Sequence, residues 1–278
     1  FVLLRVIVGP GDQINHITVG LNRQKPITKE DIYFVSDDIT SLNSVLSDLN
    51  NHIESRLRFQ IIRRGEVESY RLRNYGLVSV LRTILAVRNK KPGYARTKSI
   101  KQLISDTYQK EILDFMDQIE QDPSSTPKHI GFINKSMKFA YDLSELSKST
   151  EINLFLDQKA VDDKYKLSAI LKYGKYHIMS GYMNAFTPNN DFSYSNEIPD
   201  LTPSTLKTIL EIFKETWESF YFKKSEPEKL WDSNMFKKHD VFSNKSFVDL
   251  YVENLSKSEL SKLLASNYSA ANNSVEFN

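Results

Sequence analysis

The chain has 278 residues, and 40% of them are hydrophobic, which is enough material for one large domain or two small ones with a packed core. Cysteine is absent, so disulfides, thiolate metal sites and a cysteine nucleophile are excluded. The formal net charge of +2 hides an asymmetry, because residues 56–101 hold 13 Lys and Arg but only two acidic residues, against 24 basic and 33 acidic residues elsewhere. This segregation predicts one face that binds a polyanion.

Neither a metal centre nor a membrane segment is indicated. The five histidines are dispersed, and no two have the spacing that places a pair of ligands on one helical face. No apolar run approaches the roughly 20 residues needed to cross a bilayer, and no amphipathic basic leader is visible. We therefore expect a cytoplasmic protein without a metal, a cofactor or a membrane partner.

The first residues are typical of a buried strand followed by helices. Residues 1–8 are apolar, β-branched and aromatic apart from Arg5, and a Gly-Pro-Gly turn ends them. Since no initiator Met and no leader precede this strand, we expect the natural protein to continue upstream. Asp12 is expected to cap a helix that ends near Asn22, and a longer helix is expected after Ser36.

A hairpin and a series of helices are predicted to follow. Residues 57–62 alternate as in a strand, and after a turn at residues 64–66, residues 67–72 are expected to return as the second strand of a hairpin. Thr202 followed by Pro203 indicates a helix start with proline at its first position. From Asn74 onward the pattern is helical, with candidate helices at 77–87, 99–119, 126–148, 152–172, 175–186, 203–223 and 244–265.

The predicted fold class is α+β and predominantly α-helical, with a small α/β entry segment that contains the hairpin and a large helical body. The α/β segment is expected to cover residues 1–98 and the helical body residues 99–266. Residues 267–278, which are rich in Asn, Ser and Ala, are expected to form a flexible tail.

Several short stretches carry, in this order, a resemblance to a known family. They begin with residues 3–7 and continue with Asp12-x-Ile14-x-x-Ile17-Thr18, then Asn22-Arg23-Gln24-Lys25-Pro26-Ile27 and Asp31. Residues 63–66, and residues 85–87 leading to residues 91–96, fit the same pattern. The chain up to about Lys110 thereby resembles the core signature of the AIPR family, the abortive-infection phage-resistance proteins of bacteria. The moderately specific part of the motif is formed by Asn22, Arg23, Gln24 and Pro26.

The resemblance implies a role in anti-phage defence more than a particular reaction. In that family an earlier region with an Asn-Gly-x-Gln-Thr type motif, and often a nuclease-like domain, precedes the part matched here. The chain contains neither, so the resemblance implies an upstream domain of the same protein as a partner. We predict no catalytic residue within this chain, and the sequence leaves a homo-oligomer open.

The basic segment is the first candidate site. Guanidinium groups bind phosphate through paired donors, and an aromatic ring such as that of Tyr94 can stack on an unpaired base. The alternative is a solvated face whose arginines pair with acidic helices elsewhere in the chain. The sequence does not distinguish DNA from RNA. The candidate nucleic-acid-binding residues are Arg63, Arg64, Arg71, Arg73, Arg88, Lys90, Lys91, Tyr94 and Arg96.

Amide and carboxylate groups give further candidates. Asn22 and Gln24 can bind a ligand or tie down the following loop, and Arg23 between them favours an anion in the first case. The carboxylates at residues 37–38, 162–163 and 226–228 do not follow the strand-borne Asp…Glu-x-Lys pattern of a metal-dependent, restriction-type nuclease. The pair at residues 162–163 instead predicts an exposed helix start.

An aromatic cluster near the carboxyl end supports a second hypothesis. Core packing is its expected role, and a partner surface is the alternative. The leading functional hypothesis is nucleic-acid engagement in support of an upstream nuclease region. The second is a helical protein-interaction or assembly module that docks a partner or a phage trigger. The cluster consists of Trp217, Phe220, Tyr221 and Phe222, with Trp231 nearby.

Overall fold

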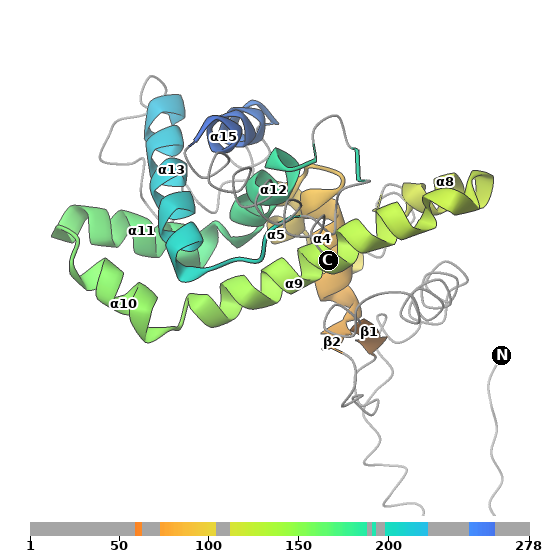
Figure 1. Ribbon diagram of the computed structural model, residues 1–278, viewed down its shortest axis with the longest axis horizontal. Coiled ribbons are helices and arrows are strands. Elements are labelled where there is room, and N and C mark those ends of the chain that lie inside the picture. Colours follow the sequence, from red (N-terminus) through yellow and green to blue (C-terminus); the bar gives the residue numbers. More distant parts are fainter. Residues whose placement is uncertain are drawn as a thin grey trace, which may run out of the picture.

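The computed structural model describes residues 59–62, 73–103, 112–187, 191–192, 198–221 and 245–258 of the chain (Figure 1). These residues form a predominantly helical α+β fold with a small sheet, which confirms the predicted fold class. The strand and helices expected before residue 57, and the tail expected over residues 267–278, lie outside the described residues.

The sheet is parallel. Strand β1, Phe59–Ile62, lies beside strand β2, Arg73–Gly76, with Phe59 opposite Arg73 and Ile62 opposite Gly76. These two strands therefore do not form a hairpin with each other, because hairpin strands are antiparallel whereas parallel strands need a crossover connection. The alternation at residues 57–62 does indicate β1. The partner strand predicted at residues 67–72 lies outside the described residues, and the observed partner is β2.

Helices make up the rest of the described chain, and most begin and end close to the predicted positions. Those predicted at 126–148 and 175–186 are observed with slightly earlier ends, and the one predicted at 203–223 is observed as far as Tyr221, the last described residue there. The observed helices are α4 Leu77–Val87, α5 Pro92–Thr97, α6 Ile100–Leu103, α8 Asp114–Gln121, the 3-10 helix η2 Pro123–Ser125, α9 Thr126–Leu146, α10 Thr150–Asp157, α11 Val161–Tyr173, α12 Lys175–Ala185, α13 Pro203–Tyr221 and α15 Lys245–Lys257.

One predicted helix is observed as two. The pattern at residues 152–172 predicts a continuous helix, but α10 ends at Asp157 and α11 begins at Val161. Ala160 has an extended backbone (φ −55°, ψ 151°), which turns the chain between them. Asp162 and Asp163 lie in the first turn of α11, where carboxylates interact favourably with the helix dipole. The predicted helix start at these two residues is thus confirmed.

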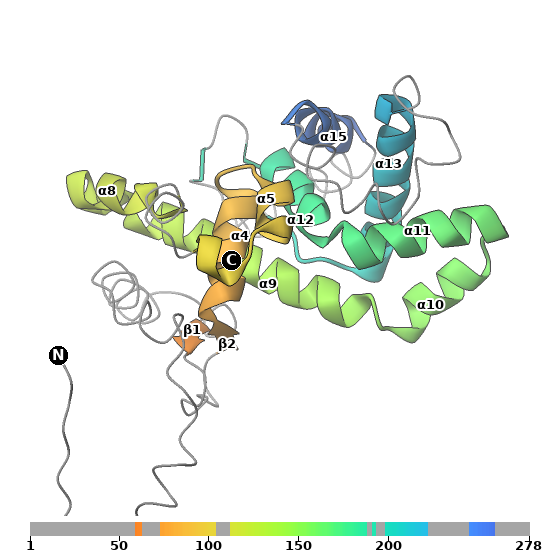
Figure 2. The ribbon, with the colours of Figure 1, turned by 180° about the vertical axis from the view of Figure 1, so that it is seen from behind.

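Helix α4 lies at the centre of the described chain and positions the candidate site. It follows β2 directly, and its side chains are buried on most of its circumference, including Leu77, Val80, Leu81 and Ile84. It packs against α5, α9 and α12, as the two opposite views show (Figures 1 and 2). Among the described residues, buried side chains on both sides of position 98 belong to one hydrophobic cluster, and the division predicted there stays a prediction.

Aromatic side chains fill the core between α13 and α15. Trp217 and Phe213 of α13 pack against Phe247 and Tyr251 of α15, with ring centroids 5.0–6.1 Å apart, and all four are completely buried. Core packing is therefore confirmed for Trp217, and also for Tyr221, whose ring lies 4.4 Å from it. The ring of Phe220 is half-buried against the same cluster, whereas Phe222 and Trp231 lie outside the described residues.

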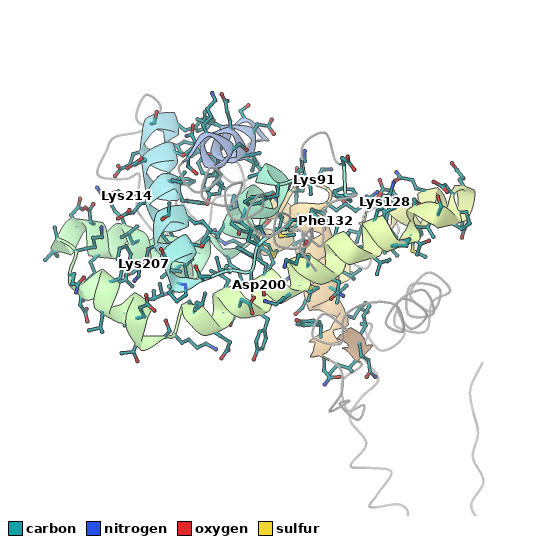
Figure 3. All side chains as sticks on the ribbon, in the orientation of Figure 1. Lys91, Lys128, Phe132, Asp200, Lys207 and Lys214 are labelled. Carbon is teal, nitrogen blue, oxygen red and sulfur yellow. The ribbon has the colours of Figure 1, made fainter. Side chains whose placement is uncertain are left out.

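Two polar contacts hold the segment before α13 in place, one to α9 and one to the start of α13 itself. The carboxylate of Asp200, labelled in Figure 3, accepts hydrogen bonds from the buried ammonium groups of Lys135 and Lys138 of α9, at 2.7 and 3.0 Å. The hydroxyl oxygen of Thr202 accepts from the backbone N–H of Thr205 at 3.1 Å, which confirms the predicted cap of α13.

Within the described parts of the chain, no helix is both long and apolar enough to cross a membrane.

Four ion pairs join the α10–α11 pair to α13. Their lysines and carboxylates alternate along both sides: α13 and α11 each supply both signs of charge, α10 supplies a carboxylate, and the turn between α10 and α11 supplies a lysine. Figure 3 labels the two lysines that α13 supplies. The pairs are Lys207 with Glu151, Lys159 with Glu211, Lys214 with Asp163, and Lys166 with Glu218, at 2.7, 2.5, 2.8 and 2.9 Å.

Candidate nucleic-acid interface

The described candidate residues gather on the turn between α4 and α5 and on α5 itself. The structure brings Arg88, Lys90, Lys91, Tyr94 and Arg96 into this region. Arg73 is the first residue of β2, paired in register with Phe59. The other candidates and the family motif lie outside the described residues: Arg63, Arg64 and Arg71, and Asn22, Arg23, Gln24 and Pro26.

The turn after α4 has an unusual backbone. The N–H groups of Arg88 and Asn89 donate to the carbonyl of Ile84 at 3.0 and 3.2 Å, and that of Lys91 donates to the carbonyl of Leu85 at 3.0 Å. The bond from Lys91 joins residues six positions apart and closes the end of the helix around a left-handed residue. That residue is Lys90, with φ 53°, where glycine is usual. The conformation destabilises a lysine by on the order of 1 kcal/mol.

Arg88 faces inward from this turn. Its side chain is only 8% exposed, forms an ion pair with Asp114 of α8, and donates to the side-chain oxygen of Gln118 at 3.3 Å. The guanidinium carbon lies 4.9 Å from the ring centroid of Phe115. Burial lowers the pKa of Arg88, and the Asp114 charge offsets part of this effect. The alternative considered for the arginines, pairing with an acidic helix elsewhere, is therefore the arrangement found at Arg88, and we leave Arg88 out of the interface.

Two lysines lie around the ring of Tyr94 instead. The Nζ atom of Lys91 is 5.8 Å from the ring centroid and that of Lys98 is 5.1 Å from it, which is within cation–π range. The two ammonium groups are thus at most about 11 Å apart, the sum of the two distances. The ring of Tyr94 is half-buried and packs against the core, so it holds the ammonium groups of Lys91 and Lys98 near one fixed position.

Arg96 lies on the other side of α5. Residues two apart on a helix differ in direction by about 200°, so Tyr94 and Arg96 point away from each other. The guanidinium carbon of Arg96 lies 5.5 Å from the ring centroid of Tyr173, the last residue of α11. Burial lowers the pKa of Arg96, and the neighbouring Tyr173 opposes this. The candidate cations of α5 are therefore divided between two sides of one short helix.

Negative charge is missing from this part of the chain. No Asp or Glu occurs between residues 69 and 105. Within the described ranges, no carboxylate pairs with Lys90 or with the exposed Lys101 of α6. The end of α5 is held in place by Arg82 of α4, whose guanidinium donates to the carbonyl of Lys98 at 3.2 Å. The stretch is thus basic in sequence, and the backbone at the end of α5 is fixed to α4.

No family model, curated protein or solved structure matches this chain. The likeness to the AIPR family therefore stays a prediction that depends on the quoted motifs.

Several of the described carboxylates form ion pairs with lysines. Among the described residues, no group of three or more His, Asp and Glu side chains is placed to hold a metal ion. Asp163, part of one candidate carboxylate pair, accepts from the ammonium of Lys214 at 2.8 Å, and this hydrogen bond lowers the pKa of Asp163. The pairs at residues 37–38 and 226–228 lie outside the described residues.

Proposed function

We propose that this chain binds the phosphate backbone of a nucleic acid through a surface that we call the α5 basic surface. The observation that carries the proposal is that Lys91 and Lys98, which flank α5, both lie within 6 Å of the Tyr94 ring centroid, in a stretch that has no acidic residue. The surface consists of Lys90, Lys91, Lys98 and Lys101, with Tyr94 as the ring between two of them.

The physical basis is electrostatic. An ammonium group near a phosphate releases condensed counterions, so binding weakens as salt rises, with a logarithmic slope of about 0.7 for each phosphate contact on a single strand. The left-handed Lys90 supports the same proposal, because strained backbone conformations persist where function requires the residue. A glycine would relieve this strain but would not carry charge.

The test is a titration of a fluorescent oligonucleotide of about 20 nucleotides with the complete chain, followed by anisotropy at about 50 to 200 mM salt. The double variant Lys91→Ala/Lys98→Ala is expected to bind at least about fivefold more weakly, with a salt slope lower by about 1.4. The control is Lys257→Ala, because Lys257 is an exposed lysine at the end of α15. Equal loss in both variants, or no binding by the unmodified chain, would overturn the proposal.

We place this binding in the setting that the AIPR likeness predicts. The chain would then be part of a cytoplasmic abortive-infection protein of bacteria, and its nucleic-acid surface would serve a nuclease region upstream in the same protein. The motifs at residues 12–27 and 85–96 support this setting. The complete open reading frame tests it: a nuclease motif ahead of residue 1 supports the setting, and a different upstream domain contradicts it.

A protein-interaction module is the second candidate function. It is favoured by apolar side chains exposed on α10 and α11: Leu154 is 56% exposed, Val161 88% and Tyr165 54%. Trp217 does not contribute to such a surface because it is completely buried. Sedimentation of the complete chain tests this candidate. Self-association that disappears in Leu154→Ser/Val161→Ser supports it, and a monomer in both proteins argues against assembly through this face.

A further inference from the structure

A second cationic group surrounds Tyr173 at the turn from α11 into α12. The guanidinium carbon of Arg96 lies 5.5 Å from the ring centroid of Tyr173, and the Nζ atom of Lys172 lies 5.1 Å from it. This repeats the arrangement around Tyr94, where two cations also lie within 6 Å of one ring. Lys172 is exposed, whereas the ring of Tyr173 is half-buried against the core.

Lys175 adds another positive charge to this turn. It follows Tyr173 and Gly174 as the first residue of α12 and is half-buried. Burial lowers the pKa of Lys175, and the nearby Lys148 lowers it further. In the described parts of the chain, no carboxylate pairs with Lys172 or Lys175. A half-buried ammonium without a counter-ion is destabilising unless an anion approaches it.

The two groups belong to one continuous region. Helix α5 packs against α12, as seen from both sides in Figures 1 and 2, and α12 begins directly after Tyr173. Tyr94 points to one side of α5, and Arg96 points to the other side, toward Tyr173. Since a helix with its side chains is about 10 Å thick, a ligand that contacts both groups must follow a sharply curved path over α5.

We propose that Lys172, Tyr173 and Lys175 form a second phosphate-binding site, and that this site and the α5 basic surface together bind one single strand of nucleic acid. This inference depends on the proposed function of the α5 basic surface. Duplex DNA is stiff over about 150 base pairs and cannot bend around a single helix, whereas an unpaired strand is flexible enough to do so. Tyrosine rings interleaved with cations are typical of proteins that bind single strands.

The test compares a fluorescent oligo(dT) of about 20 nucleotides with a duplex of the same length. Lys172→Ala/Lys175→Met is expected to bind the single strand about fivefold more weakly, with a salt slope lower by about 1.4, and to bind the duplex as the unmodified chain does. Methionine preserves the packing volume at the half-buried position. Lys172→Ala alone, at an exposed position, is expected to show about half of the slope change without any effect on folding.

The matched control is Lys164→Ala, because Lys164 is an exposed lysine of α11 that pairs with Asp157. Wild-type affinity in Lys172→Ala/Lys175→Met, together with weak binding in Lys91→Ala/Lys98→Ala, would overturn this inference and leave the proposed function intact. Equal loss for strand and duplex would overturn the preference for a single strand. No binding by the unmodified chain would overturn the proposed function as well.

Discussion

A β-carbon added to Gly181 of α12 would lie 2.2 Å from the Cε1 atom of Tyr251 of α15, closer than real β-carbon contacts occur. The two helices therefore cross at a distance that only glycine permits at this position. The Tyr251 ring is completely buried, and its hydroxyl lies 3.5 Å from the carbonyl oxygen of Ile209 of α13, to which it donates. This glycine thus sets how α12, α13 and α15 meet.

Gly181→Ala is expected to lower the free energy of unfolding by about 1–3 kcal/mol, because the methyl group displaces a ring that has no room to move. The measurement is urea unfolding followed by circular dichroism. Gly76→Ser is the control, since a β-carbon there meets nothing within 4 Å and serine can cap α4. Equal stability of Gly181→Ala and the unmodified chain would show that α15 packs differently.

Two substitutions of Lys90 separate the effect of its backbone strain from the effect of its charge. Lys90→Gly is expected to raise the free energy of unfolding by about 1 kcal/mol, because glycine adopts φ 53° freely, and to weaken oligonucleotide binding. Lys90→Ala removes the same charge without relieving the strain, so it is expected to weaken binding equally without any gain in stability. If Lys90→Gly binds as tightly as the unmodified chain, Lys90 does not belong to the α5 basic surface.

The two partners of the Arg88–Asp114 pair are expected to respond unequally to substitution. Asp114 is 51% exposed, so Arg88→Met leaves it hydrated and preserves the apolar contact with Phe115; the expected loss is below about 1 kcal/mol. Asp114→Asn leaves a buried guanidinium without its charge partner and is expected to be more destabilising, by about 2–3 kcal/mol. Thermal unfolding of both variants checks this order. Oligonucleotide binding by Arg88→Met is expected to be unchanged, and a clear loss would return Arg88 to the interface.

His129 is expected to make stability depend on pH. Its ring lies between those of Phe115 and Phe192, at 6.1 and 5.6 Å. Burial lowers its pKa most, Arg88 and Lys128 lower it further, and Asp114 acts in the opposite direction. The unfolded chain therefore takes up a proton first as the pH falls below about 6.5, and the stability present above that pH is progressively lost.

His129→Phe is expected to flatten this dependence between about pH 7.5 and 5.5, because the titrating group is removed while the ring contacts are kept. Melting temperatures measured across this range test the prediction. His177→Phe is the comparison, since His177 is a buried histidine of α12 with a ring 6.3 Å from Phe247. An unchanged pH profile in His129→Phe would show that other groups cause the loss of stability.

The predictable part of the fold is the part governed by local pattern. Helices α9, α12 and α13 follow from their apolar periodicity and from local signals such as Thr202 before Pro203. The pairing of β1 with β2 does not, because parallel and antiparallel partners have the same alternation and the choice depends on distant packing. The apolar pattern continues across the break before Val161, so periodicity does not show it, whereas the carboxylates at residues 162–163 do indicate the start of α11.

The candidate site was predictable as a stretch of charge but not as a surface. The excess of Lys and Arg identifies the region, yet it does not reveal that Arg88 turns inward to an acidic residue on α8, a contact between residues far apart in the chain. Lys172 and Lys175 lie far along the chain from the basic stretch, and tertiary packing alone brings Tyr173 to Arg96. Local sequence carries no signal for either relationship.

The alternating ion pairs between α10–α11 and α13 determine the alignment of these helices. If α13 slid by one turn, Glu211 would move toward Glu151, Lys214 toward Lys159, and Glu218 toward Asp163, so every neighbour would be a like charge. Such a slip would also separate Phe213 and Trp217 from Phe247 and Tyr251, because buried side chains are closely interdigitated. The charges on one side of α13 and the aromatic core on the other therefore favour the same register.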